Sequence, residues 1–299
     1  MTDPDSRDFR VTAVIVTFNR RELLLQTLSA VRQQTRPIDK VILVDNGSTD
    51  GTRGAEELEE FLSDRRFSYL RLDRNTGGAG GFKAGIEAAL TDQADWIWMM
   101  DDDVAPEPDV LELLLGYACQ SELVHPRRIS ADGSDADEEH YLDVLTGSRT
   151  RIGNLSFRNG KDVVYSNVAC FEGALVSRRI VETIGPPDAN YFIVDDDTLF
   201  GLKASVHTNV AYTANARMRR LLPPGRPAPW KAYYQVRNRF YLFRDACRYL
   251  DITPTTPQVT LFYLAQVIEL LRSVRQGFSY LRPSVRGFRD GIVQMRGAD

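Results

Sequence analysis

Three consecutive aspartates, Asp101, Asp102 and Asp103, end a hydrophobic run that begins at Trp96. Adjacent carboxylates repel one another, and each loses hydration where it is partly buried. A strand that runs straight into three of them favours a bound divalent cation, with phosphate oxygens as further ligands. The same residues would also suit a solvated acidic loop or a helix start, because Asp is a frequent N-cap and Pro106 follows.

A second acidic triplet, Asp195-Asp196-Asp197, follows the apolar run Tyr191–Val194. A positioned carboxylate can take the proton of an attacking hydroxyl, which is the task of a general base. The alternative is that the triplet only begins a helix, since the positive N-terminal end of a helix favours acidic side chains.

The elements that would position these groups alternate between strand and helix. β-branched runs predict buried parallel strands, and apolar residues at helical spacing predict helices between them. The expected strands cover 11–16, 41–44, 69–72 and 95–100, and the expected helices cover 23–31, 56–61 and 82–90. This alternation predicts an α/β fold with an open, Rossmann-like, mostly parallel sheet that binds ligands at the carboxyl ends of its strands.

Polar clusters follow the first three expected strands. They are Thr17-Phe18-Asn19-Arg20, the segment Asp45–Gly51 and the segment Asn75–Gly81. Asp45 is placed to accept a hydrogen bond from a base or ribose, and glycines let backbone N–H groups approach an anion. The glycine segment has neither the G-x-G-x-x-G spacing nor a phosphate-loop Lys-Ser/Thr pair. A hydride-transfer enzyme and a nucleoside triphosphatase are therefore not supported.

Composition predicts an ordinary globular protein. Of its 299 residues 43% are apolar, and a formal net charge of −4 argues against a nucleic-acid-binding protein. Its three cysteines have no metal-ligand spacing, which predicts free thiols in a reducing compartment. Residues 1–10 are expected to be disordered, and no apolar segment typical of a secretion signal begins the chain. We therefore expect a cytoplasmic protein.

Four motifs, in this order, resemble the family 2 glycosyltransferases of the GT-A fold. They are Val-Ile-Val-Thr-Phe-Asn-Arg, Val-Asp-Asn-Gly-Ser-Thr-Asp-Gly, Asn-Thr-Gly-Gly-Ala-Gly-Gly-Phe and Met-Asp-Asp-Asp. The glycine-rich element and the aspartate triplet are most similar to bacterial galactofuranosyltransferases, with rhamnosyltransferases close behind. The resemblance covers residues 11–245 and is strongest up to residue 110.

The resemblance implies an inverting, metal-dependent transfer of galactofuranose from UDP-galactofuranose to a glycan or polyprenyl-linked acceptor in cell-surface polysaccharide synthesis. Asp101 and Asp103 would bind Mn²⁺ or Mg²⁺. The donor-binding residues it implies are Thr17, Phe18, Asn19, Arg20, Asp45, Asn75, Gly77, Gly78, Gly80, Gly81 and Asp102.

The resemblance also assigns the second half of the chain. Asp197 would be the base, with Asp196 beside it. Glu172 and Gly173 would line the acceptor side, although a buried capping role suits Glu172 equally well. Aromatic side chains of residues 230–239 are expected to pack a C-terminal helix onto the core.

One expected element of the family is missing. Relatives often carry a His downstream of the base that completes the metal shell, but here the stretch reads Ala216-Arg217-Met218-Arg219-Arg220. His207 lies nearer to the base and is more simply a surface residue. The arginines would instead neutralise a diphosphate directly, which puts the need for a metal in question.

Other functions stay open at this point. A rhamnosyltransferase using dTDP-rhamnose is the nearest alternative, followed by a non-catalytic nucleotide-sugar or glycan-binding module. A metal-dependent phosphohydrolase would need more ligands than three His residues supply. We expect a nucleotide-sugar-binding half over 11–110, an acceptor and base half over 111–250, and a helical segment over 251–299.

An apolar stripe marks this C-terminal segment. Beyond residue 271, six Arg oppose two Asp, which suits peripheral contact with an anionic bilayer at the inner face of the cell membrane. No apolar run is long enough to span a membrane. The stripe would equally pack on the catalytic core or on a second subunit of a homo-oligomer. Its residues are Leu261, Phe262, Leu264, Val267, Ile268, Leu271 and Val274.

Overall fold

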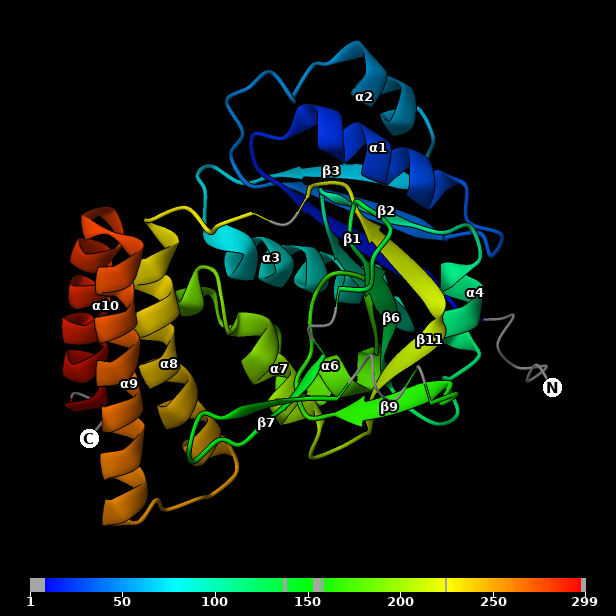
Figure 1. The fold of residues 1–299 in the computed structure, drawn as a ribbon. Helices are drawn as coiled ribbons and strands as arrows, with labels where there is room; N and C mark the ends of the chain where they lie inside the picture. The colour runs from blue at the N-terminus through cyan, green and yellow to red at the C-terminus, as the bar shows by residue number, and fades with distance from the viewer. Residues whose placement is uncertain (1–8, 137–138, 153–156, 158, 224, 297–299) are drawn as a thin grey trace.

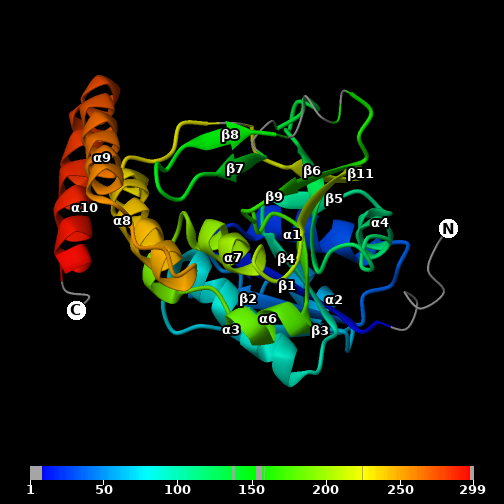
Figure 2. The ribbon, with the colours of Figure 1, turned by 90° about the horizontal axis from the view of Figure 1, so that it is seen from below.

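The computed structural model describes residues 9–296 apart from 137–138, 153–156, 158 and 224. Helices cover both faces of one large sheet, and a layer of long helices stands at one side (Figure 1, Figure 2). The strands are β1 (Val11–Thr17), β2 (Lys40–Asp45), β3 (Phe67–Arg71), β4 (Trp96–Asp101), β5 (Val104–Pro106), β6 (Leu123–Ile129), β7 (His140–Leu142), β8 (Arg149–Arg151), β9 (Val163–Ser166), β10 (Ala174–Ser177) and β11 (Val210–Arg220). The helices are α1 (Arg21–Arg32), α2 (Glu56–Leu62), α3 (Gly77–Thr91), α4 (Val110–Leu115), α6 (Arg178–Ile184), α7 (Asp196–Ala204), α8 (Lys231–Tyr249), α9 (Thr256–Gln276) and α10 (Phe278–Arg296).

The sheet is parallel where the first polar clusters lie. Its strand order is β3-β2-β1-β4-β10-β6-β11-β5, with β9 paired to β11. β1 pairs in parallel with β2 and β4, and β2 pairs in parallel with β3. β10 runs antiparallel between β4 and β6, and β11 is parallel to β6. The expected open α/β sheet with C-terminal helices is confirmed.

β1 is buried along its whole length because helices pack on both faces of the sheet. Ala13 and Ile15 pack in the apolar cluster that includes residues of α1, α2 and α4. Val14 and Val16 pack on the other face, with residues of α3. Successive side chains of a strand point to opposite faces, so a continuous apolar run satisfies both layers.

Some element boundaries differ from the sequence-based expectation. α3 begins at Gly77 and not at Phe82, so the glycine segment forms the first turns of a helix. β11, for which no expectation was stated, runs from Val210 to Arg220, with buried and exposed side chains alternating along its second half. The aspartate triplet leads into the short strand β5, which pairs with β11, and not into a helix at Pro106.

The glycines of α3 let this helix lie close to β1. A Cβ on Gly81 would lie 2.5 Å from Val16 Cγ1, and a Cβ on Gly85 would lie 2.3 Å from Val14 Cγ1. Glycine costs a helix up to about 1 kcal/mol relative to Ala, which is why the sequence alone favours a loop here. Close packing of the helix on the sheet offsets that cost.

Replacing Gly85 by Ala should lower the free energy of unfolding by about 1–3 kcal/mol, because the added methyl group overpacks the contact with Val14. Urea denaturation would measure the loss. Gly78→Ala is the matched control, since a Cβ there meets no atom within 4 Å. An equal loss in both variants would show that packing on β1 is not the reason for the glycine.

The helices α8, α9 and α10 form the lateral layer. Phe240 of α8 meets the rings of Phe262 on α9 and Phe288 on α10, at centroid distances of 5.5 and 5.4 Å. A Cβ on Gly287 or Gly291 would lie within 2.4 Å of α8 atoms, so these glycines let α10 pack tightly on α8. Among the described residues, no helix is long and apolar enough to cross a membrane.

One continuous sheet joins the segments 11–110 and 111–250, so their division into donor and acceptor halves stays a functional prediction. The boundary expected at residue 250 falls between α8 and α9. Residues 1–8, which belong to the segment expected to be disordered, lie outside the described residues.

Candidate active site

The carboxyl ends of β1, β2 and β4 meet at one edge of the sheet. Thr17 pairs with Asp45 across β1 and β2, and Val16 pairs with Asp101 across β1 and β4. Parallel order therefore brings the Thr17–Arg20 segment, the segment after Asp45 and the aspartate triplet together.

Asp102 ties the loop after β1 to the end of β4. It is 3% exposed, and it accepts hydrogen bonds from Thr17 Oγ1 at 2.7 Å and Phe18 N at 3.3 Å. Arg20 donates to Asp102 at 3.2 Å and to Asp103 at 2.6 Å. Burial raises the pKa of Asp102 to about 6, although Thr17 and Arg20 lower it. Contrary to the expectation from the sequence, Asp102 is not open to a ribose or diphosphate; it positions the loop.

The Asp101 carboxylate makes no hydrogen bond or ion pair with a described residue. Burial raises its pKa well above the usual value, and Asp103, Glu172 and Asp102 raise it further. A cation would stabilise such a carboxylate, and an all-oxygen donor set suits Mg²⁺ or Mn²⁺.

Asp101 and Asp103 therefore fit a divalent ion whose remaining ligands come from outside the protein. In the described part of the chain, no group of three or more His, Cys, Asp or Glu side chains could hold a metal ion. His207 instead bonds through Nε2 to the Tyr249 hydroxyl at 2.8 Å. Burial lowers the pKa of His125 to about 3, so this side chain is neutral.

Asp45 is fully buried under two neighbouring side chains of β3. Its carboxylate accepts hydrogen bonds from Ser48 N at 2.7 Å, from the Tyr69 hydroxyl and from Arg71 at 2.7 Å. Direct contact of Asp45 with a base or ribose would require the exposed Arg71 side chain to move. Phe18, by contrast, is 37% exposed at this edge.

Asn46, which sequence reasoning did not single out, organises the start of α3. It is 2% exposed, and its Nδ2 donates to Gly77 O at 2.8 Å. The Gly77 N–H in turn donates to Asn75 Oδ1 at 2.8 Å, and Ala79 N donates to Phe192 O at 3.1 Å. These backbone groups are therefore satisfied within the protein.

Of the four glycines expected to face the donor, Gly78 is the one with open space around it. A Cβ on Gly77 would lie 1.9 Å from Phe192 O. Gly80 and Gly81 are similarly closed by neighbouring side chains. Close packing therefore explains three of these glycines, and the contact of this segment with a donor stays a prediction.

The segment before α7 is held in a strained backbone conformation. Phe192, Val194 and Asp195 have φ values of 66, 71 and 65°. Such conformations cost about 1–3 kcal/mol each outside glycine and persist where the surroundings impose them. Asn238 on α8, fully buried, donates from Nδ2 to three backbone oxygens within residues 191–194 at 2.7 to 3.0 Å. This side chain, also missed from the sequence, holds the segment in place.

Asp197 opens into a cavity of about 530 Å³, whereas Asp196 does not line it and is 8% exposed. Burial raises the pKa of both carboxyl groups, that of Asp197 to about 6. Asp195 raises the Asp197 pKa further, while the Thr198 N–H and Arg149 lower it. A carboxylate that ionises near neutral pH is suited to act as a general base.

Arginines and carboxylates pair around this cavity. Arg220 donates to both oxygens of Glu172, at 2.9 and 3.1 Å, and Arg128 lies 3.7 Å from the same carboxylate. Arg149 donates to Asp195 Oδ1 at 2.5 Å. The other oxygen of Asp195 is buried without a hydrogen-bond partner. The cavity is therefore suited to polar and anionic ligands.

Glu172 connects the two parts of the site. Its charge raises the pKa of Asp101, and its side chain lines the cavity that contains Asp197. Gly173 does not line that cavity, and its expected contact with the acceptor stays a prediction. Its φ of +93° and its N–H bond to Met99 O at 2.8 Å place it in the turn that presents Glu172.

A family model, Glycosyl transferase family 2, matches residues 12–185 of the chain. The chain belongs to glycosyl transferase family 2. The matched part includes Asp45, the Asp101–Asp103 triplet and Glu172, and it ends before Asp195–Asp197. The motif resemblance is thereby confirmed.

Curated relatives of this family 2 chain include galactofuranosyltransferases and a rhamnosyltransferase. Galactofuranosyltransferase GlfT1 of Mycolicibacterium smegmatis is 35% identical over 192 residues, and that of Mycobacterium tuberculosis is 34% identical over 191 residues. Each match spans 62% of this chain and 62% of the relative's own length. The dTDP-rhamnosyl transferase RfbF of Shigella flexneri is 22% identical over 300 residues. This match spans 96% of this chain and 97% of the length of RfbF.

Solved structures share the fold. S. aureus TarS 1–349 has a TM-score of 0.60 at 13% identity, covering 95% of this chain and 80% of that chain. GalNAc-T7, solved with UDP, GalNAc and Mn²⁺, has a TM-score of 0.56 at 15% identity. The match covers 74% of this chain and 45% of the GalNAc-T7 chain. The expected GT-A fold is confirmed.

Asn238→Ala should reduce turnover at least about tenfold while leaving UDP affinity near wild type, because the loss of three hydrogen bonds lets the strained segment relax and shift Asp197. Steady-state kinetics and UDP titration would separate the two effects. Asn215→Ala, an exposed Asn on β11, is the matched control. Wild-type turnover in the Asn238 variant would contradict a positioning role.

Proposed function

We propose that this family 2 protein is an inverting glycosyltransferase that uses a nucleotide-diphosphate sugar, with Asp197 as its general base. One observation carries the proposal: the charge of Glu172 raises the pKa of Asp101, the metal-ligand candidate, and the same side chain lines the cavity that contains Asp197. The donor we favour is UDP-galactofuranose. The GlfT1 relatives and the glycine and aspartate motifs support this choice.

The reaction follows from this arrangement. An acceptor hydroxyl enters the cavity, and Asp197 takes its proton as the oxygen attacks the anomeric carbon of the donor sugar. The new C–O bond forms as the bond from that carbon to the diphosphate oxygen breaks, and the nucleoside diphosphate leaves with the bonding electrons. The guanidinium groups of Arg20 and Arg220 would offset charge on the departing diphosphate. A divalent cation held by Asp101 and Asp103 would neutralise that diphosphate as well.

The nearest alternative is a rhamnosyltransferase that uses dTDP-rhamnose. RfbF supports it, because its similarity runs over nearly the whole chain, including the cavity of Asp197. A non-catalytic binding module would keep the nucleotide loops but would not need a base with a raised pKa in an open cavity. A donor-hydrolysis screen across UDP and dTDP sugars would decide among the three.

Asp197→Asn should cut transfer by about a hundredfold or more while UDP and metal affinity stay near wild type, because the variant cannot accept the proton. Asp103→Ala should lose transfer and also weaken Mn²⁺-dependent UDP binding. Transfer assays and calorimetric titration with UDP would show this difference. Asp196→Asn is the matched control, because it makes the same change at the buried neighbouring residue, which does not line the cavity.

The rate of the wild-type protein should also fall as pH drops through about 6, because Asp197 becomes protonated there. If Asp196→Asn shows the large loss and Asp197→Asn little, the base is the neighbouring residue. Full activity of Asp103→Ala, or of wild type in excess EDTA, would remove the metal from the proposal. If neither Asp196→Asn nor Asp197→Asn reduces transfer, the triplet only caps α7.

We also propose peripheral contact of α9 with an anionic membrane at the cytoplasmic face. The residues of the apolar stripe expected from the sequence do not all lie on one exposed face of α9. Phe262, at 2% exposed, packs on α8, and the Val274 side chain lies outside the described ones. The remaining residues are 40 to 62% exposed and face away from the rest of the chain: Leu261, Leu264, Val267, Ile268 and Leu271.

The exposed arginines Arg272, Arg275 and Arg282 lie at the end of the α9–α10 hairpin that follows this face. Leu264→Glu combined with Leu271→Glu should abolish sedimentation with phosphatidylglycerol vesicles, and binding of wild type should weaken with salt. Val206→Glu, at another exposed apolar site, is the control. A dimer that the double variant dissociates, with no vesicle binding by wild type, would assign the face to a second subunit instead.

A further inference from the structure

The guanidinium of Arg20 contacts a carboxylate that a divalent ion at the donor edge would also need. Its Nη1 lies 2.6 Å from Asp103 Oδ2 and 3.2 Å from Asp102 Oδ1. Burial and the neighbouring carboxylates raise the pKa of Asp101, and the charge of Arg20 opposes them. One guanidinium thus acts on all three carboxylates, which include the two candidate metal ligands Asp101 and Asp103.

Arg20 and a divalent ion cannot both hold Asp103 at full strength. Each is attracted to the carboxylate, but two cations on one carboxylate repel each other. Water screens little of that repulsion here, because the side chains of Asp102 and Asp103 are 4% and 24% exposed. A cation that binds Asp103 therefore weakens the contact of Arg20 with the same side chain.

The Arg20 side chain has room to move away from Asp103. It is 41% exposed, and it also lines a cavity of about 360 Å³ at the start of α1. Asp102 would keep its bonds from Thr17 Oγ1 and the Phe18 N–H after such a movement. The loop after β1 therefore does not depend on the contact between Arg20 and Asp103 alone.

We propose that Arg20 gives up Asp103 to a divalent ion and then binds the diphosphate of the donor, an inference that rests on the proposed function. Arginine pairs with phosphate through charge-assisted and often bidentate hydrogen bonds, so the diphosphate replaces the carboxylate as its partner. Metal and nucleotide would then bind cooperatively, because the nucleotide stabilises the guanidinium that the metal releases.

Arg20→Gln tests this exchange by the sign of its effect. Without nucleotide, Mn²⁺ should bind the variant about fivefold more tightly than wild type, because its competitor is gone. With Mn²⁺ present, UDP should bind about tenfold more weakly, because the diphosphate has lost a guanidinium. A purely structural role of Arg20 would instead weaken Mn²⁺ binding and would overturn the exchange. Calorimetric titration of the full chain would measure both affinities.

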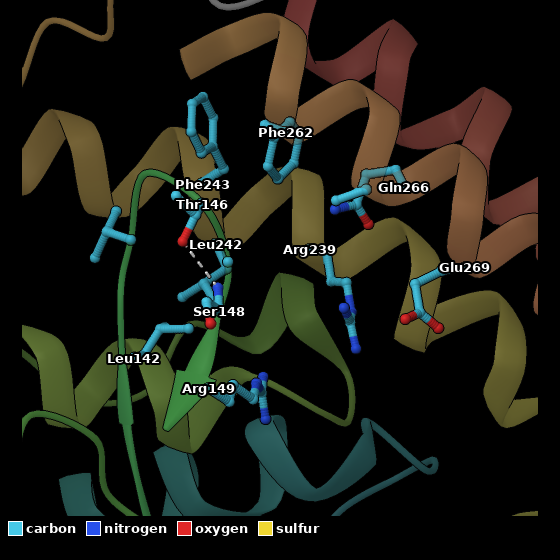
Figure 3. Close-up of a pocket in the computed structure, with 13 residues that line it drawn as sticks. Leu142, Thr146, Ser148, Arg149, Arg239, Leu242, Phe243, Phe262, Gln266 and Glu269 are labelled. Atoms are coloured by element: carbon cyan, nitrogen blue, oxygen red, sulfur yellow. Dashed lines mark hydrogen bonds between the residues drawn. The ribbon is translucent and has the colours of Figure 1, made fainter. Parts of the chain in front are cut away.

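Two other arginines provide matched controls. Arg21→Gln removes the adjacent charge, and the Arg21 side chain makes no ion pair or hydrogen bond with a described residue. Arg239→Gln removes a charge from a separate cavity, which lies between the β7–β8 hairpin and the helices α8 and α9 and is also lined by Glu269 (Figure 3). Both variants should bind Mn²⁺ and UDP like wild type. Equal tightening of Mn²⁺ binding in Arg21→Gln would assign the effect to net charge and overturn the exchange.

A measurement on wild type covers the case in which Arg20→Gln does not fold. The side-chain Nε signal of Arg20 in NMR spectra, assigned by its loss in Arg20→Lys, should shift when Mg²⁺ is added alone and again when UDP follows. A signal that Mg²⁺ leaves unchanged would contradict the exchange. Absent Mn²⁺-dependent UDP binding in wild type counts against the proposed function and the exchange with it. Such binding in wild type, without tighter Mn²⁺ binding in Arg20→Gln, counts against the exchange alone.

Discussion

The buried carboxylate of Asp102 is the interaction on which the donor edge depends. Its contacts with Thr17, the Phe18 N–H and Arg20 fix the loop after β1 against the end of β4. A group lost from such a buried network leaves its partners unsatisfied, at about 1–3 kcal/mol each. Arg20 also donates to Asp103, so one guanidinium offsets the charge of two of the three carboxylates.

The acceptor side is organised by a different principle, the pairing of arginines with carboxylates. Arg220 holds Glu172 and Arg149 holds Asp195, so the acidic groups other than Asp197 already have cationic partners. These pairs keep the cavity polar without adding a large net charge. They also leave the guanidinium groups at the cavity wall, where they can meet an anionic ligand.

The sequence allowed the core of the fold to be predicted, because β1, β2 and β4 are continuous apolar runs that end in polar clusters. It predicted the start of α3 wrongly, since glycine disfavours helices locally and only contact with β1 explains Gly81 and Gly85. The roles of Asn46 and Asn238 were out of reach for a similar reason. Asn46 lies within one of the four motifs and Asn238 within the segment 230–239, but the sequence does not show which partners their amides reach, because those partners come from elements distant in the sequence.

The bond from Asn238 to Val194 spans 44 residues of sequence. The strained turn before Asp197 therefore lacks this support when it leaves the ribosome, and it gains it only after α8 has been made and has docked. The pairings of β1 with β2 and β4, and of β2 with β3, lie within residues 11–101, so they can form earlier, because the N-terminal part of a chain emerges first. Truncation within α8 would thus remove the support of the turn before Asp197, and through the bond from Ala79 N to Phe192 O it would also reach the start of α3.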